Sequence, residues 1–152
     1  MPFDRLIRAV DRWAQRNPEV QVFAQIGNTD LVPEAMQWAK TLPPDEYHRK
    51  VVACDLLIGH AGMGTVITAG ELGKPLLVMP RRGNLRETRN NHQVATAKWL
   101  ATRAGIRVAM DEDELMVELD RTRPAAMQPF AASKVAGELI DALRHFIEQD
   151  SR

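Results

Sequence analysis

Residues 56–80 alternate between apolar runs and glycine-rich turns, and this pattern constrains the fold more than any other part of the chain. The apolar runs at 56–58 and 76–79 are typical of short buried strands. Between them, the glycine-rich segment 59–64 predicts a loop, and the helical spacing at 65–72 predicts a helix that stops at the next glycine. The stretch therefore predicts a strand, a loop, a helix and a second strand, in that order.

The loop at 59–64 suits a phosphate group. It leads into a helix for which Thr65 is the predicted N-cap, and a helix start offers unpaired N–H groups and the positive end of a dipole. Gly62 and Gly64 allow positive φ and a close approach of the backbone to a ligand. The spacing matches neither the dinucleotide fingerprint nor a Walker loop, so on its own it does not identify the ligand.

The rest of the chain continues the alternation of helices and strands. Further helices are expected at 4–16, 44–54, 93–104, 113–119 and 130–148, and further strands at 20–26, 35–40 and 106–110. This order predicts an α/β fold, with a Rossmann-like parallel sheet and helices on both faces. Residues 1–152 should form a single domain that ends in the helix at 130–148. Ligands of such sheets bind beyond the carboxyl ends of the strands, where the loops at 27–33, 59–65 and 80–92 are expected.

Composition excludes several classes of function. Twenty basic and twenty acidic residues cancel, so no global field attracts nucleic acid. No apolar run approaches the roughly 18 residues that a membrane span needs, and the N-terminus lacks the apolar core of a signal peptide. The single Cys54 excludes an intramolecular disulfide and is expected to be a buried structural thiol. The acidic run at 111–114 is expected to cap a helix, so we predict no metal site. Because no membrane span and no signal peptide are recognisable, we predict a cytoplasmic location.

Three polar groups are candidates for chemistry. His60 follows a strand directly, where its ring either orders the glycine loop or contacts a ligand. Four arginines share one loop, which is either a solvated basic loop or an anion-binding one; they are Arg81, Arg82, Arg86 and Arg89. Any single polar residue of the run Asn90–Gln93 would be explained as a helix cap. Four such residues together suggest recognition of hydroxyl groups, as on a ribose or sugar.

These residues resemble a known family. The segments His60–Thr65, Leu72–Pro75, Val78–Arg82 and Arg89–Gln93 are similar to the C-terminal, sugar-nucleotide-binding domain of family 28 glycosyltransferases, which is half of a GT-B fold. The likeness extends from Pro2 to about residue 108. It is greatest to the stand-alone small subunits of two-component N-acetylglucosaminyl and exopolysaccharide glycosyltransferases.

The resemblance implies a UDP-sugar donor, bound without a structural metal or other cofactor. It implies that the diphosphate meets the loop and helix at 60–65 and that the segment ending at residue 93 contacts the sugar or ribose. We expect the substrate site to comprise His60, Ala61, Gly62, Met63, Gly64, Thr65, Thr68, Arg81, Arg82, Asn90, Asn91, His92 and Gln93. His60 is the candidate catalytic residue.

Two positions depart from the family pattern at the expected ribose site. Many relatives have a glutamate where this chain has Thr68, and an aspartate is common where it has Asn91. A neutral hydroxyl or amide group binds a ribose less strongly than a carboxylate does, so both changes weaken the expected contacts.

The first strand of the family pattern is apparently missing. Relatives have a short apolar strand and a Gly-Thr turn just before the segment that matches Pro2–Ile7. Loss of this strand would leave its neighbours in the sheet unpaired. An upstream start, a truncated version and a partner chain that fills the place all explain the pattern. We expect reduced or no activity from this chain alone.

The resemblance implies the donor-binding subunit of a glycosyltransferase. Such a subunit moves a hexose or N-acetylhexosamine from a UDP-sugar to a lipid-linked acceptor, which a membrane-anchored partner subunit holds. The sequence also leaves open whether the protein forms a homo-oligomer. The alternative is a non-catalytic, degenerate transferase domain that serves as a binding or assembly module. A dehydrogenase is disfavoured because the dinucleotide fingerprint is absent.

Overall fold

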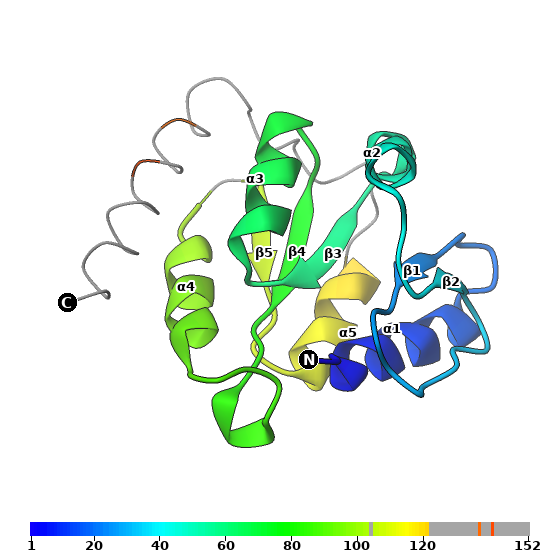
Figure 1. Ribbon diagram of the computed structural model, residues 1–152, viewed down its shortest axis with the longest axis horizontal. Coiled ribbons are helices and arrows are strands. Elements are labelled where there is room, and N and C mark those ends of the chain that lie inside the picture. The colour runs from blue at the N-terminus through cyan, green and yellow to red at the C-terminus, as the bar shows by residue number, and fades with distance from the viewer. Residues whose placement is uncertain (104, 122–136, 138–140, 142–152) are drawn as a thin grey trace.

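The computed structural model describes residues 1–103, 105–121, 137 and 141. Helices and strands alternate along these residues (Figure 1). The helices are α1 (Asp4–Arg16), α2 (Pro44–Ala53), α3 (Met63–Glu71), α4 (His92–Leu100) and α5 (Glu112–Arg121), with a short 3-10 helix, η1 (Gly83–Leu85). The strands are β1 (Phe23–Gln25), β2 (Gln37–Ala39), β3 (Leu57–His60), β4 (Leu76–Met79) and β5 (Ile106–Val108).

All strand pairs are parallel, but they form two sheets rather than one. In one sheet β1 pairs with β2, and in the other β4 lies between β3 and β5. Figure 1 shows the strands in the order β5, β4, β3, β1, β2 across the molecule. The expected Rossmann-like α/β architecture is therefore confirmed, and the division falls between β3 and β1.

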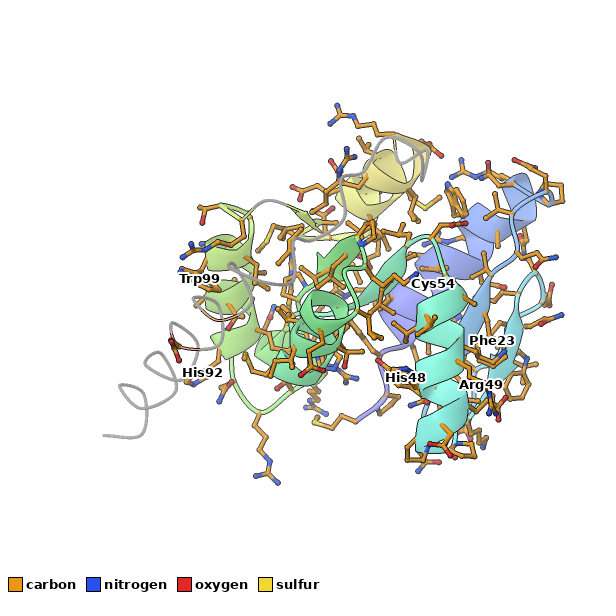
Figure 2. The ribbon with its side chains drawn as sticks, turned by 90° about the horizontal axis from the view of Figure 1, so that it is seen from above. Phe23, His48, Arg49, Cys54, His92 and Trp99 are labelled. Carbon is orange, nitrogen blue, oxygen red and sulfur yellow. The ribbon has the colours of Figure 1, made fainter. Side chains whose placement is uncertain are left out.

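Strand β4 carries a core on each face. Its four residues are fully buried, and because successive side chains point to opposite faces, they divide between two apolar clusters. Leu77 and Met79 pack with α1 and α5, whereas Leu76 and Val78 pack with α3 and α4. Figure 2 shows α1 and α5 on one side of the sheets and α2, α3 and α4 on the other.

Most predicted elements are present, with shorter strands than expected. The helix at 4–16 is confirmed because its apolar residues face the core in one stripe: Ile7, Ala9, Val10, Trp13 and Ala14. The strands expected at 20–26 and 35–40 shrink to three residues each, and the helix expected at 93–104 ends at Leu100. Of the helix predicted at 130–148, the structure describes only residues 137 and 141, which are both helical; the rest lies outside the described residues.

The beginning of the chain lies at the carboxyl ends of the strands. Asp4, the first residue of α1, accepts a hydrogen bond of 2.6 Å from the hydroxyl of Thr29, which follows β1. The guanidinium of Arg81, which follows β4, donates to the carbonyl oxygens of Met1 and Pro2 at 2.6 and 3.3 Å. The carboxyl ends of β1 and β4 therefore point to one rim, as expected for a ligand-binding edge.

Candidate functional site

Helix α3 begins at the rim without a side-chain cap. Gly62 is the N-cap residue, and no side-chain hydrogen bond from the described residues closes the helix end there. Val66 donates to the Gly62 carbonyl, so the N–H groups of Met63, Gly64 and Thr65 in the first turn have no partner within the helix. The prediction of Thr65 as N-cap is wrong, since β3 runs on to His60 and the helix starts two residues before Thr65. The link between strand and helix is only two residues long.

The two glycines at this helix start have different roles. Neither adopts the positive φ that a glycine allows. A Cβ atom on Gly62 would lie 2.0 Å from Cε1 of His60, so this glycine makes room for the imidazole ring. A Cβ on Gly64 would meet nothing within 4 Å. The helix start is therefore open to an approaching group at Gly64 and closed by His60 at Gly62.

His60 is held neutral at the end of β3. Burial lowers the pKa of its imidazole, the positive charge of Arg81 lowers it further, and an interaction with the Gln93 side chain partly offsets both effects. Its Nδ1 atom is buried and has no hydrogen-bond partner among the described residues. A buried, unpaired ring nitrogen costs free energy, which makes His60 a strained point of the rim.

The remaining residues at the start of α3 support this geometry. Ala61 is buried in the core shared by α3 and α4, and Met63 packs against it. The methyl group of Thr65 lies over Gly59, where a Cβ would approach it to 2.8 Å. The Thr68 hydroxyl donates to the Gly64 carbonyl at 2.9 Å, so its proton is used inside the helix and its oxygen can still accept a bond.

Arg81 and Arg82 hold the loop that follows β4. Besides the carbonyls of Met1 and Pro2, the Arg81 guanidinium donates to the Glu87 carbonyl at 3.1 Å. It also lies 4.9 Å from the centre of the Phe3 ring. Arg82 donates to the Met110 carbonyl at 2.6 Å. Both side chains therefore join the loop to other parts of the fold.

A partly buried ion pair that the sequence reasoning missed supports the same loop. Arg5 of α1 donates two parallel hydrogen bonds, of 2.8 and 2.9 Å, to the carboxylate of Glu87. It donates a third, of 3.1 Å, to Glu112 at the start of α5. These carboxylates raise the pKa of the Arg5 guanidinium, while burial opposes the rise. Glu87 is the only acidic residue in the arginine-rich loop 80–90. That was the one feature of the sequence that could have indicated an ion pair at this position.

The residues of the Asn90–Gln93 run have structural hydrogen bonds. The side-chain oxygen of Asn91 accepts from the Gly83 N–H at 2.8 Å, and that of Asn90 accepts from the His92 N–H at 3.2 Å. Gln93 accepts from the Arg81 N–H at 3.1 Å and also interacts with the ring of His60. His92 is exposed at the start of α4 (Figure 2). Gln93 therefore connects the α4 start to the strand end that carries His60.

Other predicted features have plain structural roles. Cys54 is half-buried and burial raises the pKa of its thiol, which suits a structural cysteine. Asp111 accepts a hydrogen bond of 2.9 Å from the Glu114 N–H, so the acidic run caps α5 as predicted. The described residues contain no cluster of three or more side chains suited to a metal ion. Arg86 and Arg89 are exposed.

Taken together, the rim offers fixed donors to an anion. Three backbone N–H groups, the positive end of the α3 dipole and a neutral histidine meet at one strand end. Such groups bind a phosphate and stabilise charge that develops on it, without needing a metal ion.

Comparison with known proteins assigns the family. A sequence model of the glycosyltransferase family 28 C-terminal domain matches residues 2–146. The chain belongs to this family. No curated relative matches the chain.

A solved structure shares the fold of this family 28 domain. It is described as "Crystal Structure Analysis of the Glycotransferase of kitacinnamycin" and aligns with a TM-score of 0.56 at 18% sequence identity. The alignment covers 91% of this chain and 34% of that glycosyltransferase, so this chain spans about a third of the length of the solved protein. Within the described part of the chain, the helices are too short or too polar to cross a membrane.

Proposed function

We propose that this family 28 domain binds a UDP-sugar and acts as the donor-binding subunit of a glycosyltransferase. The uncapped start of α3, with open space at Gly64, is the observation that carries the proposal. It lies at the carboxyl end of β3, where ligands of parallel sheets bind. The family match is consistent with a sugar-nucleotide donor.

The diphosphate is the part of the donor that this site suits best. The N–H groups of Met63, Gly64 and Thr65 would donate to its oxygens, and the helix dipole would favour the charge. When the sugar leaves, negative charge grows on the departing UDP, and fixed donors stabilise it without reorganising. His60, kept neutral by burial, can donate to the same group from its ring without a competing positive charge of its own.

The sugar and ribose would meet the remaining polar groups of the rim. Thr68 keeps an acceptor oxygen, and Asn90, Asn91 and Gln93 keep the donor ends of their amides. His92 completes this segment at the start of α4. Amide groups bind sugar hydroxyls through hydrogen bonds and add no charge to the site. The site should therefore prefer a hexose or N-acetylhexosamine over a charged sugar.

The acceptor would come from a second protein. We propose a membrane-anchored subunit that presents a lipid-linked acceptor and supplies its general base, while this domain works in the cytoplasm at that membrane. The described rim residues are a neutral histidine, amides and arginines engaged with the fold, which suit the donor half of the reaction. Exopolysaccharide biosynthesis is the setting that this two-component arrangement suits.

A non-catalytic binding or assembly module is the second candidate. Two observations favour it: the Arg81 and Arg82 guanidiniums are engaged within the fold, and the Thr68 hydroxyl donates to its own helix. Turnover of a UDP-sugar by this chain together with its membrane subunit would distinguish an enzyme from such a module.

Calorimetric titration of the full chain with UDP, uridine and NADH tests donor binding. We expect UDP to bind and to raise the melting temperature with its concentration, while uridine and NADH bind more weakly, because the diphosphate fits the helix start. The matched variant is Gly64→Ala, which adds a methyl group at the open position without disturbing the fold. We expect this variant to bind UDP at least about tenfold more weakly, because the added methyl group keeps the phosphate away from the N–H groups. No heat and no stabilisation with millimolar UDP would contradict the proposal.

A further inference from the structure

The segment that follows β4 is held from the side of α1. Pro80, the first residue after β4, is buried, and its carbonyl oxygen accepts a hydrogen bond of 2.9 Å from the Arg5 guanidinium. Two residues further on, the Arg82 N–H donates to the Glu87 carboxylate at 2.9 Å. The same carboxylate accepts the two parallel hydrogen bonds from Arg5. We call these two side chains, Arg5 and Glu87, the loop clamp.

The loop clamp sets the direction of the backbone group that lies between its two attachment points. Successive residues of an extended chain direct their N–H and C=O groups to alternate sides, and Arg82 is extended, with φ −117° and ψ 129°. Because the clamp holds Pro80 and Arg82 on one side, the Arg81 N–H points to the other. There it donates to the side-chain oxygen of Gln93 at 3.1 Å. The clamp therefore fixes a backbone donor that holds Gln93.

Gln93 and Arg81 connect this segment to His60. The Gln93 side chain is hydrogen-bonded to the His60 ring, and the charge of the Arg81 guanidinium acts on the same ring. This guanidinium is held in turn by the Glu87 carbonyl, at 3.1 Å. The orientation of the imidazole and the position of the charge beside it both depend on the segment after β4.

We propose that Arg5 and Glu87 are positioning residues of the donor site. They act on His60 through the segment after β4 and Gln93. Helix α1, which carries Arg5, lies on the opposite side of the sheets from α3 (Figure 2). The two side chains are only 12% and 10% exposed, so they would hold the site without contacting the donor. The proposal rests on the proposed function, because the rim around His60 is where the UDP-sugar would bind.

The geometry of the clamp, as well as its charge, carries this role. The planar guanidinium of Arg5 offers two parallel donors to the Glu87 carboxylate and a contact to the Pro80 carbonyl from the same fork. A lysine ammonium keeps the positive charge but lacks the rigid fork that makes these contacts together. Arg5→Lys therefore separates the geometry of the clamp from its charge.

The His60 ring reports movement of the segment rather than loss of a nearby charge. Burial, the Arg81 charge and the Gln93 hydrogen bond shift the pKa of the His60 imidazole. The charges of Arg5 and Glu87 are not among these causes. If a variant of the clamp changes the pKa of His60, the segment that carries Arg81 and holds Gln93 has moved.

Two glutamates that bind the same guanidinium provide a matched pair of variants. Glu87→Gln keeps the size of the side chain and removes the charge that holds Arg5 and the Arg82 N–H. Glu112→Gln makes the same change at the start of α5, where the carboxylate accepts one bond of 3.1 Å from Arg5. Within the described part of the chain, no hydrogen bond joins Glu112 to the loop after β4. The second variant therefore disturbs the same arginine without disturbing the clamp.

Two measurements on folded samples of each full-length variant test the proposal. An NMR titration of the ring Cε1 proton follows His60, and calorimetric titration with UDP follows the donor site. In Glu87→Gln and Arg5→Lys we expect the pKa of His60 to rise toward its ordinary value of 6.5, because the ring becomes less buried and the Arg81 charge moves away. We expect both variants to bind UDP at least about fivefold more weakly. Glu112→Gln should leave the His60 pKa and the UDP affinity unchanged.

A purely structural ion pair would lower the melting temperature without moving either value in the folded protein. An unchanged His60 pKa in Glu87→Gln and Arg5→Lys would therefore overturn the proposal, and so would an equal rise in Glu112→Gln. Unchanged UDP affinity in variants whose His60 pKa has risen would also overturn it. Absence of UDP binding by the native chain would contradict the proposed function instead, because the His60 titration is made without UDP.

Discussion

Replacing Gly62 with alanine tests the packing at the start of α3. The new Cβ would lie 2.0 Å from Cε1 and 2.5 Å from Nδ1 of His60. Non-bonded carbon atoms settle at about 3.5 Å, so the ring must withdraw by roughly 1.5 Å. Forced repacking of this kind costs about 1–3 kcal/mol. For a chain of this size, a loss of about 2 kcal/mol lowers the melting temperature by roughly 4–8 °C.

The Gly64→Ala variant is the matched control for this change. It makes the same chemical substitution two residues along the same helix start, where a Cβ meets nothing within 4 Å. Alanine is the better helix former, so we expect a gain of about 0.5 kcal/mol. Chemical denaturation of both variants gives the two free energies of unfolding directly.

A second readout follows the His60 ring itself. Burial lowers the pKa of His60 in the folded protein, so displacing the ring toward solvent should move that pKa up toward its ordinary value of 6.5. An NMR titration of the ring Cε1 proton measures this shift in Gly62→Ala and in Gly64→Ala. If Gly62→Ala is as stable as Gly64→Ala and leaves the His60 titration unchanged, the packing argument is refuted.

Three further predictions concern the residues around the rim. Because the folded-state pKa of His60 is lowered, its contribution to stability is full above about pH 6.5 and is lost as the pH falls through the folded value. The difference in unfolding free energy between the native chain and His60→Gln should therefore shrink from about pH 7.5 to about pH 5, and a constant difference would contradict the prediction. Glu87→Gln leaves the partly buried Arg5 without its bidentate partner and should cost about 2 kcal/mol, measured by urea denaturation; a loss under about 0.5 kcal/mol would show that the pair is unimportant. Arg86 has a left-handed φ of 57°, so Arg86→Gly should gain about 1 kcal/mol, and a loss of stability would count against this conformation.

Sequence reasoning predicted the elements that depend on local patterns. The stripe of apolar residues defined α1 correctly, and the fully buried run Leu76–Met79 is a strand with the predicted bounds. The helix start was misplaced because Thr65 is a common N-cap residue, while the turn after β3 depends on how His60 packs over Gly62. A contact between a ring and a backbone atom two residues away leaves no periodic signal in the sequence.

The roles of charged residues were harder to predict. A run of arginines suggested an anion site, but Arg81 and Arg82 reach carbonyl groups at the chain start and at Met110. Arg5 and Glu87 are far apart in the sequence, and only the fold brings them together. The division of the parallel strands into two sheets, between β1 and β3, likewise required the structure.

Residue-resolved NMR with UDP tests the donor site most directly. The account predicts that the amide signals of Met63, Gly64 and Thr65 shift most as UDP is added, together with the His60 ring, because the diphosphate would bind at the α3 start. It also predicts that these shifts disappear in Gly64→Ala while the rest of the spectrum stays folded. Shifts confined to other parts of the chain, or none at millimolar UDP, would contradict the account.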